Sequence, residues 1–236
     1  MKIIFLNCWQ AKAGKAFFDF VERESETTDI FCFQEVSPDL YLTLTASMSG
    51  HKGLYKSSKI LLFDKIKSGQ AIFVKKRFKV NASVKIPLYR ELRNDIGFMQ
   101  CISTLVGGKN LWLGNLHGKS RPGHKLDTPA RLKQSKIIID FFKTKKEAKI
   151  IGGDFNLLPQ TKSIEMFEEG GYVDLIKKFK IPTTRNRLAW NQLKKNEEKQ
   201  LFADYVFVSP VVKVKNFSVP NLEISDHTPL ILDFEI

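Results

Sequence analysis

The stretch IIGGDFN, residues 150–156, ends an apolar, strand-like run in two glycines, a carboxylate and an amide. Glycine allows the backbone to approach another chain or a ligand closely, and here the pair directly precedes Asp154 and Asn156. Asp and Asn also favour turns, so one acidic residue at a strand end is a weak signal by itself. Together with the glycine pair, the two side chains predict a ligand-binding strand end.

The same arrangement recurs along the chain, where apolar runs begin or end in residues that can bind a metal or a phosphate. These segments are FLN ending at Asn7, CFQE ending at Glu35, LGNLHG with His117, FADYVFVS with Asp204, and ISDHTPL with Asp226 and His227. ISDHTPL is unusual because an acid and an imidazole lie side by side ahead of an apolar strand. We expect the strand ends to deliver these side chains to one cleft.

Phosphate-ester hydrolysis explains why these residue types would gather. A hard cation such as Mg²⁺, or Mn²⁺ as its substitute, prefers carboxylate and amide oxygens and keeps several waters. Glu35 and Asp226 are the predicted carboxylate ligands, with Asn7 as a further ligand or as an orienting residue. Such a metal neutralises charge on the phosphoryl oxygens and stabilises the leaving oxygen.

The attacking water needs a base. His227 is predicted to take this role if a buried acid, Asp204, fixes its tautomer. Asp154 and Asn156 are expected to position the water, the phosphate or the leaving group. His117 can donate to a non-bridging oxygen and so stabilise the transition state. The choice of general base between the histidine and Asp154 stays open.

The remaining sequence alternates strand-like runs with a few helices. Ser37-Pro38 and Thr128-Pro129 each indicate a helix cap followed by proline at the first helical position. The predicted inner stripe of the second of these helices consists of Leu132, Ser135, Ile139 and Phe142. Gly107-Gly108 indicates a hairpin between two neighbouring strands.

Strands dominate the predicted order of elements. The expected strands are 2–8, 29–35, 52–56, 59–64, 69–76, 78–86, 96–106, 109–116, 148–153, 203–208, 211–218 and 228–235, and further helices are expected at 14–26 and 162–169. Strands followed by helices, then several hairpin strands, and then the same again, predict two packed sheets with helices outside them.

Taken in order, LNCW, FCFQEV, LHG, GGDFN, FADYVFVS and ISDHTPL resemble the endonuclease/exonuclease/phosphatase superfamily, which includes DNase I and the apurinic endonucleases. The resemblance covers residues 3–235. It implies an α/β fold of the DNase I type, a four-layer αββα sandwich of two packed mixed β-sheets, built as one domain over residues 1–236. It also implies magnesium-dependent attack on a phosphate ester.

The resemblance assigns a role to each matched position. It implies that Glu35 binds the metal, that Asn7 supports the metal site, and that Asp226 is the adjacent metal-linked acid. Asp154 and Asn156 match the pair that handles the nucleophile or leaving group and the phosphate.

Other matched positions concern the base and the phosphate. Asp204 resembles the acid that holds the catalytic histidine, His227, and His117 lies where some branches have His and the apurinic endonucleases have Tyr. Trp9 stands where the apurinic endonucleases carry a second carboxylate, and Asn7-Cys8-Trp9 is similar to the neutral sphingomyelinase branch. This departure keeps lipid phosphodiesters open as substrates.

The charge balance favours a polyanionic partner. The chain carries 38 Lys and Arg against 25 Asp and Glu, a formal charge of +13, although solvation alone can also explain such an excess. Arg121, Arg185 and Trp190 are the predicted substrate-binding residues, because arginine and an aromatic ring can clamp a phosphate and stack a base. His51 and His124 lie in no motif and are expected on the surface.

The sequence also bears on the compartment. No stretch approaches the roughly 20 apolar residues of a membrane span, and the apolar run at the N-terminus is too short for a signal peptide. Cys8, Cys32 and Cys101 lie far apart in apolar runs, which predicts buried, reduced thiols and no zinc site. We therefore expect a cytoplasmic monomer.

Three functions are compatible with these patterns. The leading hypothesis is a magnesium-dependent phosphodiesterase that acts as a nuclease on DNA or RNA. The second is a lipid or small-molecule phosphoesterase of the sphingomyelinase or phosphoinositide-phosphatase type, whose substrate would be a phospholipid head group or a small phosphoester. The third is an inactive nucleic-acid-binding module, which the presence of every central ligand argues against.

Overall fold

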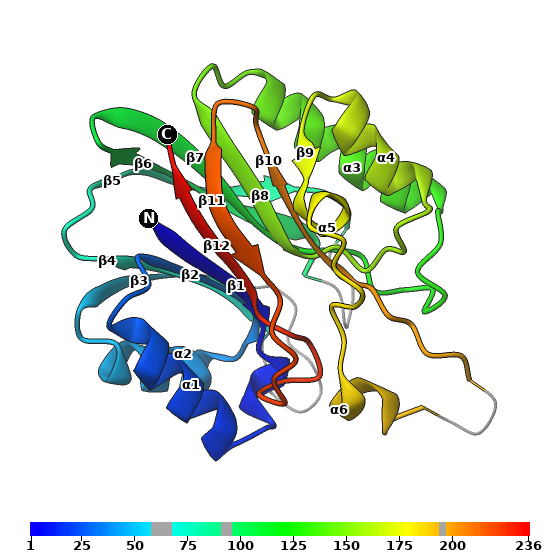
Figure 1. The fold of residues 1–236 in the computed structure, drawn as a ribbon, viewed down its shortest axis with the longest axis horizontal. Coiled ribbons are helices and arrows are strands. Elements are labelled where there is room, and N and C mark those ends of the chain that lie inside the picture. Colours follow the sequence, from blue (N-terminus) through cyan, green and yellow to red (C-terminus); the bar gives the residue numbers. More distant parts are fainter. Residues whose placement is uncertain (58–67, 91–95, 194–196) are drawn as a thin grey trace.

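The computed structural model describes residues 1–57, 68–90, 96–193 and 197–236. Its strands form two six-stranded sheets that pack face to face (Figure 1). The first sheet has the order β11 (Lys213–Ser218), β12 (Leu230–Glu235), β1 (Lys2–Asn7), β2 (Ile30–Val36), β4 (Gly69–Lys75) and β3 (His51–Ser57). The second has the order β5 (Val80–Pro87), β6 (Phe98–Val106), β7 (Lys109–His117), β8 (Ala148–Asp154), β10 (Asp204–Val208) and β9 (Val173–Asp174).

Each sheet contains one parallel strand pair, β1 with β2 and β7 with β8, among antiparallel neighbours. The registers pair Asn7 with Gln34 and His117 with Asp154 at the carboxyl ends of these strands. Carboxyl ends of parallel neighbours lie at the same edge of a sheet. The polar residues that follow the apolar runs are therefore gathered at one edge of each sheet.

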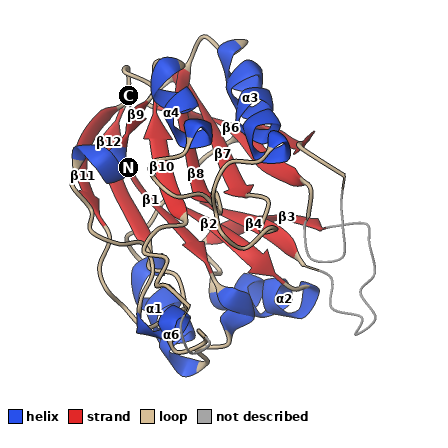
Figure 2. Ribbon diagram, turned by 90° about the vertical axis from the view of Figure 1, so that its right-hand side faces the viewer, coloured by secondary structure: helices blue, strands red, loops and turns tan. Residues whose placement is uncertain are grey.

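Helices cover the outer face of both sheets (Figure 2). They are α1 (Lys15–Ser25), α2 (Pro38–Ser47), α3 (Pro129–Lys143), α4 (Lys162–Glu169) and α5 (Leu175–Lys178), whereas α6 (Arg187–Trp190) lies apart from both sheets in the connection that precedes β10 (Figure 1). Ile3 and Phe5 of β1 pack between the sheets, whereas Ile4 and Leu6 pack against α1 and α2. On the other side, α3, α4 and α5 pack on the second sheet. The predicted four-layer αββα sandwich is confirmed.

The glycine pair in β8 lies where the backbone has no space for side chains. A Cβ added at Gly152 would lie 2.7 Å from the ring of Phe5 in the opposite sheet. Gly153 has a φ of 125°, and an added Cβ would collide with the carbonyl oxygen of Leu116. The pair therefore lets β8 pack tightly against β1 and β7 just before Asp154.

Both predicted helix starts are confirmed. The side chain of Ser37 accepts a hydrogen bond from the N–H of Leu40, and that of Thr128 accepts one from Arg131, with proline in each first turn. Such caps satisfy N–H groups that have no partner within the helix. The other predicted elements within the described residues differ from the observed ones by at most two residues at either end.

The predicted inner stripe of α3 is partly wrong. Ser135 and Phe142 are buried, but Leu132 and Ile139 are only half-buried. The residues that are buried instead are Arg131, Gln134 and Ile138. Arg131 is buried because its guanidinium donates to backbone carbonyl oxygens of the preceding loop, which hydrophobic periodicity does not reveal.

One further expectation, an exposed His51, is wrong. His51 is buried rather than exposed, and its Nε2 lies 2.9 Å from the carbonyl oxygen of Thr28. The predicted strand 59–64 lies outside the described residues.

The sequence also did not predict β9, α5 or α6, each of which has four residues or fewer, too few for a periodic pattern. His124 is exposed as expected, and within the described residues no helix is long and apolar enough to cross a membrane.

Candidate active site

The side-chain amide of Asn7 connects the two sheets at their shared edge. Its Nδ2 donates to Glu35 Oε1 at 3.1 Å and to Asp154 Oδ2 at 3.0 Å. The N–H of Trp9 donates to Asn7 Oδ1 at 3.0 Å, which fixes the orientation of the amide. One amide therefore holds an acid of the first sheet beside an acid of the second.

A β-bulge in β2 directs Glu35 toward this edge. The register between β2 and β4 shifts between Gln34 and Val36, and Glu35 has a φ of 57°. Gln34 points between the sheets, where its Nε2 donates to Asn115 Oδ1, while Val36 packs in the cluster beneath α1 and α2. A bulge commonly redirects a side chain beside an active site, and here it frees Glu35 from both packed faces.

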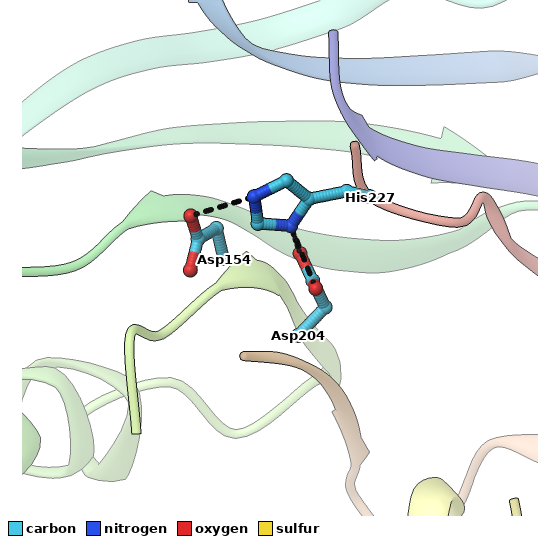
Figure 3. A group of neighbouring side chains, drawn as sticks. All are labelled: Asp154, Asp204 and His227. Carbon is cyan, nitrogen blue, oxygen red and sulfur yellow. Dashed lines mark hydrogen bonds and ion pairs between the residues drawn. The ribbon is translucent and has the colours of Figure 1, made fainter. Parts of the chain in front are cut away.

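His227 lies between two buried acids, Asp154 and Asp204 (Figure 3). Its Nδ1 is 2.9 and 2.8 Å from the two carboxylate oxygens of Asp204, and its Nε2 is 3.7 Å from Asp154 Oδ2. Burial, and then the nearby charge of Arg185, lower the pKa of His227 to about 4. The ring is therefore neutral near pH 7, with Nδ1–H donated to Asp204 and the lone pair on Nε2.

The two acids respond differently to the same buried environment. Burial raises the pKa of Asp204 well above its usual value, and the adjacent Asp154 carboxylate raises it further. Burial also opposes the ionisation of Asp154, but His227, Lys125 and His117 outweigh it and lower the pKa of Asp154. Asp154 is therefore the acid that these surroundings keep ionised.

Arg185 reaches into the cluster of polar side chains formed by Glu35, Asp154, Asp204, Asp226 and His227. Its Nη1 lies 2.7 Å from His227 Nε2, and its Nη2 donates to Asp226 Oδ2 at 2.9 Å. Asp226 Oδ1 is 3.9 Å from His227 Nε2. Because the imidazole is neutral, Arg185 donates a hydrogen bond to the lone pair of His227 Nε2. This is the lone pair with which the imidazole would accept a proton if it acted as a base.

The short segment around Arg185 also holds the strand ends in place. Thr184 Oγ1 accepts from the N–H groups of Ala203 and Asp204, and the Thr184 carbonyl accepts from Thr228. Asn186 Nδ2 donates to the carbonyl oxygens of Leu222 and Ser225. The sequence analysis did not identify Thr184 and Asn186, although these polar residues flank the predicted Arg185.

His117 completes the cluster from the end of β7. Its Nε2 is 3.7 Å from Glu35 Oε1 and 3.7 Å from Asp154 Oδ2, and the ring is buried. Its Nδ1 has no hydrogen-bond partner among the described residues. A buried imidazole that faces two acids can donate a proton to a bound anion.

Asn156 is held by hydrogen bonds of its backbone and of its side chain, and its N–H also reaches the Ala203 carbonyl at 3.2 Å. Its N–H donates to Asp154 Oδ1 at 2.9 Å, and its Nδ2 donates to the Gly118 carbonyl at 3.2 Å. Its Oδ1 accepts from Lys125 Nζ at 3.1 Å. The sequence places Lys125 in the basic loop that follows His117 but does not distinguish it from the other basic residues of that loop, so it was not among the predicted substrate-binding residues.

Two predicted substrate-binding residues lie apart from these contacts. Arg121 is exposed in the loop between β7 and α3. Trp190 lies in α6, where Lys199 Nζ is 5.0 Å from its ring centroid. Of the three residues predicted to bind substrate, the structure brings Arg185 alone into contact with the acids and His227.

The cluster has the composition of a divalent-cation site. Asp154, Asp204 and His227 offer ligand atoms within 4.8 Å of one another, but the hydrogen bond to Asp204 already occupies Nδ1 of the histidine. Glu35 and Asp226 offer carboxylates on either side of Asp154. Of these acids, Asp226 alone forms an ion pair with Arg185, so Glu35 and Asp154 remain as carboxylates that could hold a divalent cation.

Comparison with known proteins agrees with this geometry. A model of the Endonuclease/Exonuclease/phosphatase family matches residues 6–227. No curated protein matches the sequence.

The fold is shared with several solved structures at low sequence identity. An endonuclease/exonuclease/phosphatase family protein from Leptotrichia buccalis is 18% identical with a TM-score of 0.77, and 100% of each chain is covered. Humanized D. rerio TDP2 is 17% identical with a TM-score of 0.78, covering 100% of this chain and 99% of that one. Mannosyl-6-phosphatase Bt3783 from Bacteroides thetaiotaomicron is 17% identical with a TM-score of 0.73, and both chains are covered fully.

Proposed function

Because the chain belongs to the endonuclease/exonuclease/phosphatase family, we propose that it is a magnesium-dependent phosphodiesterase that cleaves a DNA or RNA strand. The observation that carries the proposal is the convergence of three side chains at one edge: Asn7 links Glu35 to Asp154, and His227 lies 3.7 Å from Asp154. The formal charge of +13 supports a polyanionic substrate.

Glu35 and Asp226 are the residues that would hold the cation, with Asp154 between them. When bound, Mg²⁺ or Mn²⁺ would neutralise charge on the phosphoryl group and the leaving oxygen. Asn7 presents Nδ2 rather than its oxygen to the carboxylates, because Oδ1 accepts from Trp9. Of its two predicted roles, the geometry favours orienting the acids over binding the metal.

His227 is proposed as the general base. Asp204 holds its Nδ1–H, so Nε2 can take a proton from water that lies beside Asp154. Arg185 Nη1 must first leave Nε2, and a phosphate oxygen is the natural new acceptor for its guanidinium. Substrate binding would thus recruit Arg185 and release the base at the same time.

The phosphate would be held by groups on the opposite side of Asp154 from Asp204. His117 Nε2 lies 3.7 Å from both Glu35 and Asp154, so it can donate to a non-bridging oxygen placed between them. Asn156 is fixed by Gly118 and by the N–H contact to Asp154, which prepares its side chain to orient the phosphate or the leaving group.

The test is cleavage of labelled single- and double-stranded DNA and RNA with Mg²⁺ or Mn²⁺. Activity should disappear with EDTA and in His227→Ala. The control is His124→Asn, because His124 is exposed and Asn can still accept from the Leu126 N–H that its ring now binds. Failure of the wild type to cleave any of these polymers would refute the nuclease proposal, and salt-sensitive binding without turnover would identify an inactive binding module.

A second candidate is hydrolysis of a lipid head group or a small phosphoester. It is favoured by Trp9, which replaces a second carboxylate of the apurinic endonucleases, and by the structural likeness to a mannosyl-6-phosphatase. A panel of sphingomyelin, phosphoinositides and sugar phosphates, assayed beside the nucleic acids under the same metal conditions, separates the two candidates. Turnover restricted to the small substrates would select the second.

A further inference from the structure

Lys125 is a buried cation at the edge of the candidate active site. Only 7% of the residue is exposed, and it adopts a φ of 56° in the loop between β7 and α3. Its Nζ lies 3.1 Å from Asn156 Oδ1. Among the described residues, this amide oxygen is the one acceptor within hydrogen-bonding distance of the ammonium, which has three N–H groups to donate.

The protein compensates this buried charge only partly. No carboxylate of the described residues lies within ion-pair distance of Nζ, although Asp154, Asp204 and Asp226 attract it from farther away. Burial dominates and lowers the pKa of Lys125. A buried ammonium with one neutral acceptor needs a further anionic partner to offset its lost hydration.

The loop is built to keep Lys125 in this position. Buried Arg131 donates to the carbonyl oxygens of Leu126 and Pro122, on either side of the lysine. The carbonyl of Lys125 itself accepts from the N–H of Leu158, just beyond Asn156. Because the loop is held at Pro122, at Leu126 and at the carbonyl of Lys125 itself, the left-handed conformation of Lys125 is maintained and its side chain is directed to Asn156.

We propose that Lys125 is a substrate-binding residue of this site, and that its ammonium donates to a non-bridging oxygen of the phosphate that Asn156 orients. The assignment rests on the proposed phosphoesterase function. A phosphate oxygen supplies both the negative charge and the acceptor that the protein lacks around Nζ. Lys125 thereby takes the role that the sequence analysis gave to the nearby Arg121, which lies exposed in the same loop.

The experiment measures binding of inorganic phosphate by calorimetry, in phosphate-free buffer with Mg²⁺, together with thermal unfolding. The variants are Lys125→Met, Lys125→Arg and the control Lys133→Met, in which an exposed lysine of α3 is replaced. Lys125→Met should weaken phosphate binding by about tenfold or more, because a charge-assisted hydrogen bond is lost. Lys125→Arg should recover part of the affinity, and Lys133→Met should bind as the wild type does.

Thermal unfolding distinguishes a binding role from a structural one. Removal of a poorly compensated buried charge should leave Tm unchanged or raise it, while phosphate affinity falls. A lower Tm with unchanged phosphate affinity would instead show that Lys125 only supports Asn156, and would overturn the proposal. Wild-type protein that binds no phosphate at millimolar concentration would overturn it as well.

Failure of the proposed function gives a different pattern. Phosphate binding that depends on Lys125, in a protein that hydrolyses no member of the nucleic-acid or small-phosphoester panels, would refute the catalytic proposal and support the binding assignment. Hydrolysis by the wild type that is fully retained in Lys125→Met, with unchanged phosphate affinity, would refute the assignment and leave the catalytic proposal standing.

Discussion

The imidazole of His227 has a partner at each ring nitrogen, Asp204 at Nδ1 and Arg185 at Nε2. Only the first partnership suits a general base, because it fixes the tautomer and leaves the lone pair on Nε2. Asp204→Asn should therefore reduce kcat by about 100-fold to 10,000-fold, since an amide can donate to Nδ1 and favour the opposite tautomer. Steady-state kinetics with the best substrate measures the effect.

The kinetic effect of Asp204→Asn must come from the altered tautomer of His227 and not from unfolding of the protein. Asn has nearly the same shape as Asp, so circular dichroism and Tm of Asp204→Asn should stay close to wild type. A variant that folds normally and keeps wild-type kcat would contradict the role of Asp204 as the orienting acid.

A second residue-scale prediction concerns pH and stability. Burial raises the pKa of Asp174 to about 6, while its carboxylate caps α5 by accepting from the N–H of Ile176. The native state thus binds this proton more tightly than the unfolded chain, so stability falls as pH rises from about 4 through 6. Asp174→Asn keeps a capping acceptor without the charge, and should stabilise the protein by up to about 3 kcal/mol at pH 8.

Urea unfolding at pH 8 and pH 4 measures this difference. The gain in the free energy of unfolding should shrink toward pH 4, where the unfolded Asp is also partly protonated. A gain of equal size at both pH values would mean that the substitution acts through packing rather than through ionisation.

Some residues could be predicted from sequence and others could not. Asn7, Glu35 and His227 each end or precede an apolar strand, so their convergence followed from the expected sheets, and the structure brings them together. Lys125 and Arg131 are charged side chains that become buried through contacts with amide and carbonyl oxygens. Hydrophobic periodicity treats such residues as exposed, so the burial of these two side chains could not be predicted, although the sequence placed Lys125 in the basic loop that follows His117.

At the scale of elements, β8 can approach β1 closely because Gly152 has no side chain. Gly152→Ala places a methyl group 2.7 Å from the ring of Phe5, so we expect it to destabilise the fold by about 1–3 kcal/mol. Urea unfolding measures the loss. Gly50→Ala is the control, because a Cβ at Gly50 would meet nothing within 4 Å.

The double variant Gly152→Ala with Phe5→Leu tests the cause. The smaller Leu should relieve the clash, so the two substitutions together should cost less than the sum of the single ones. Additive losses would show that Gly152 is needed for backbone conformation rather than for space.

Elements with strong local signals were predicted best. Ser37 and Thr128 predicted the starts of two helices, because each side chain caps its helix by accepting a hydrogen bond from an N–H only three residues later. By contrast, α5, α6 and β9 have no periodic pattern, and they form because neighbouring elements position them. Asn186 shows this dependence, since α6 follows a residue bound to the carbonyls of Leu222 and Ser225.

At the scale of the whole molecule, the excess of positive charge makes a prediction about substrate size. If the substrate is a polynucleotide, many phosphates contact the protein, and kcat/KM should fall steeply and linearly with salt on logarithmic axes. A small phosphoester contacts only the catalytic cluster and should show a weak salt dependence. Equal salt dependence for both substrates would mean that the +13 charge does not contribute to recognition.

The shared amide of Asn7 has a consequence for the integrity of the molecule. Glu35 and Asp154 come from opposite sheets, so a cation held by Glu35 and Asp226 with Asp154 between them would brace the two sheets against separation. Binding of the cation would then make transient separation of the two sheets rarer. Whenever the sheets separate, a lysine-rich chain exposes many sites at which trypsin can cut. Protection from trypsin should therefore increase with Mg²⁺ concentration, so that resistance to digestion reports metal loading without any substrate.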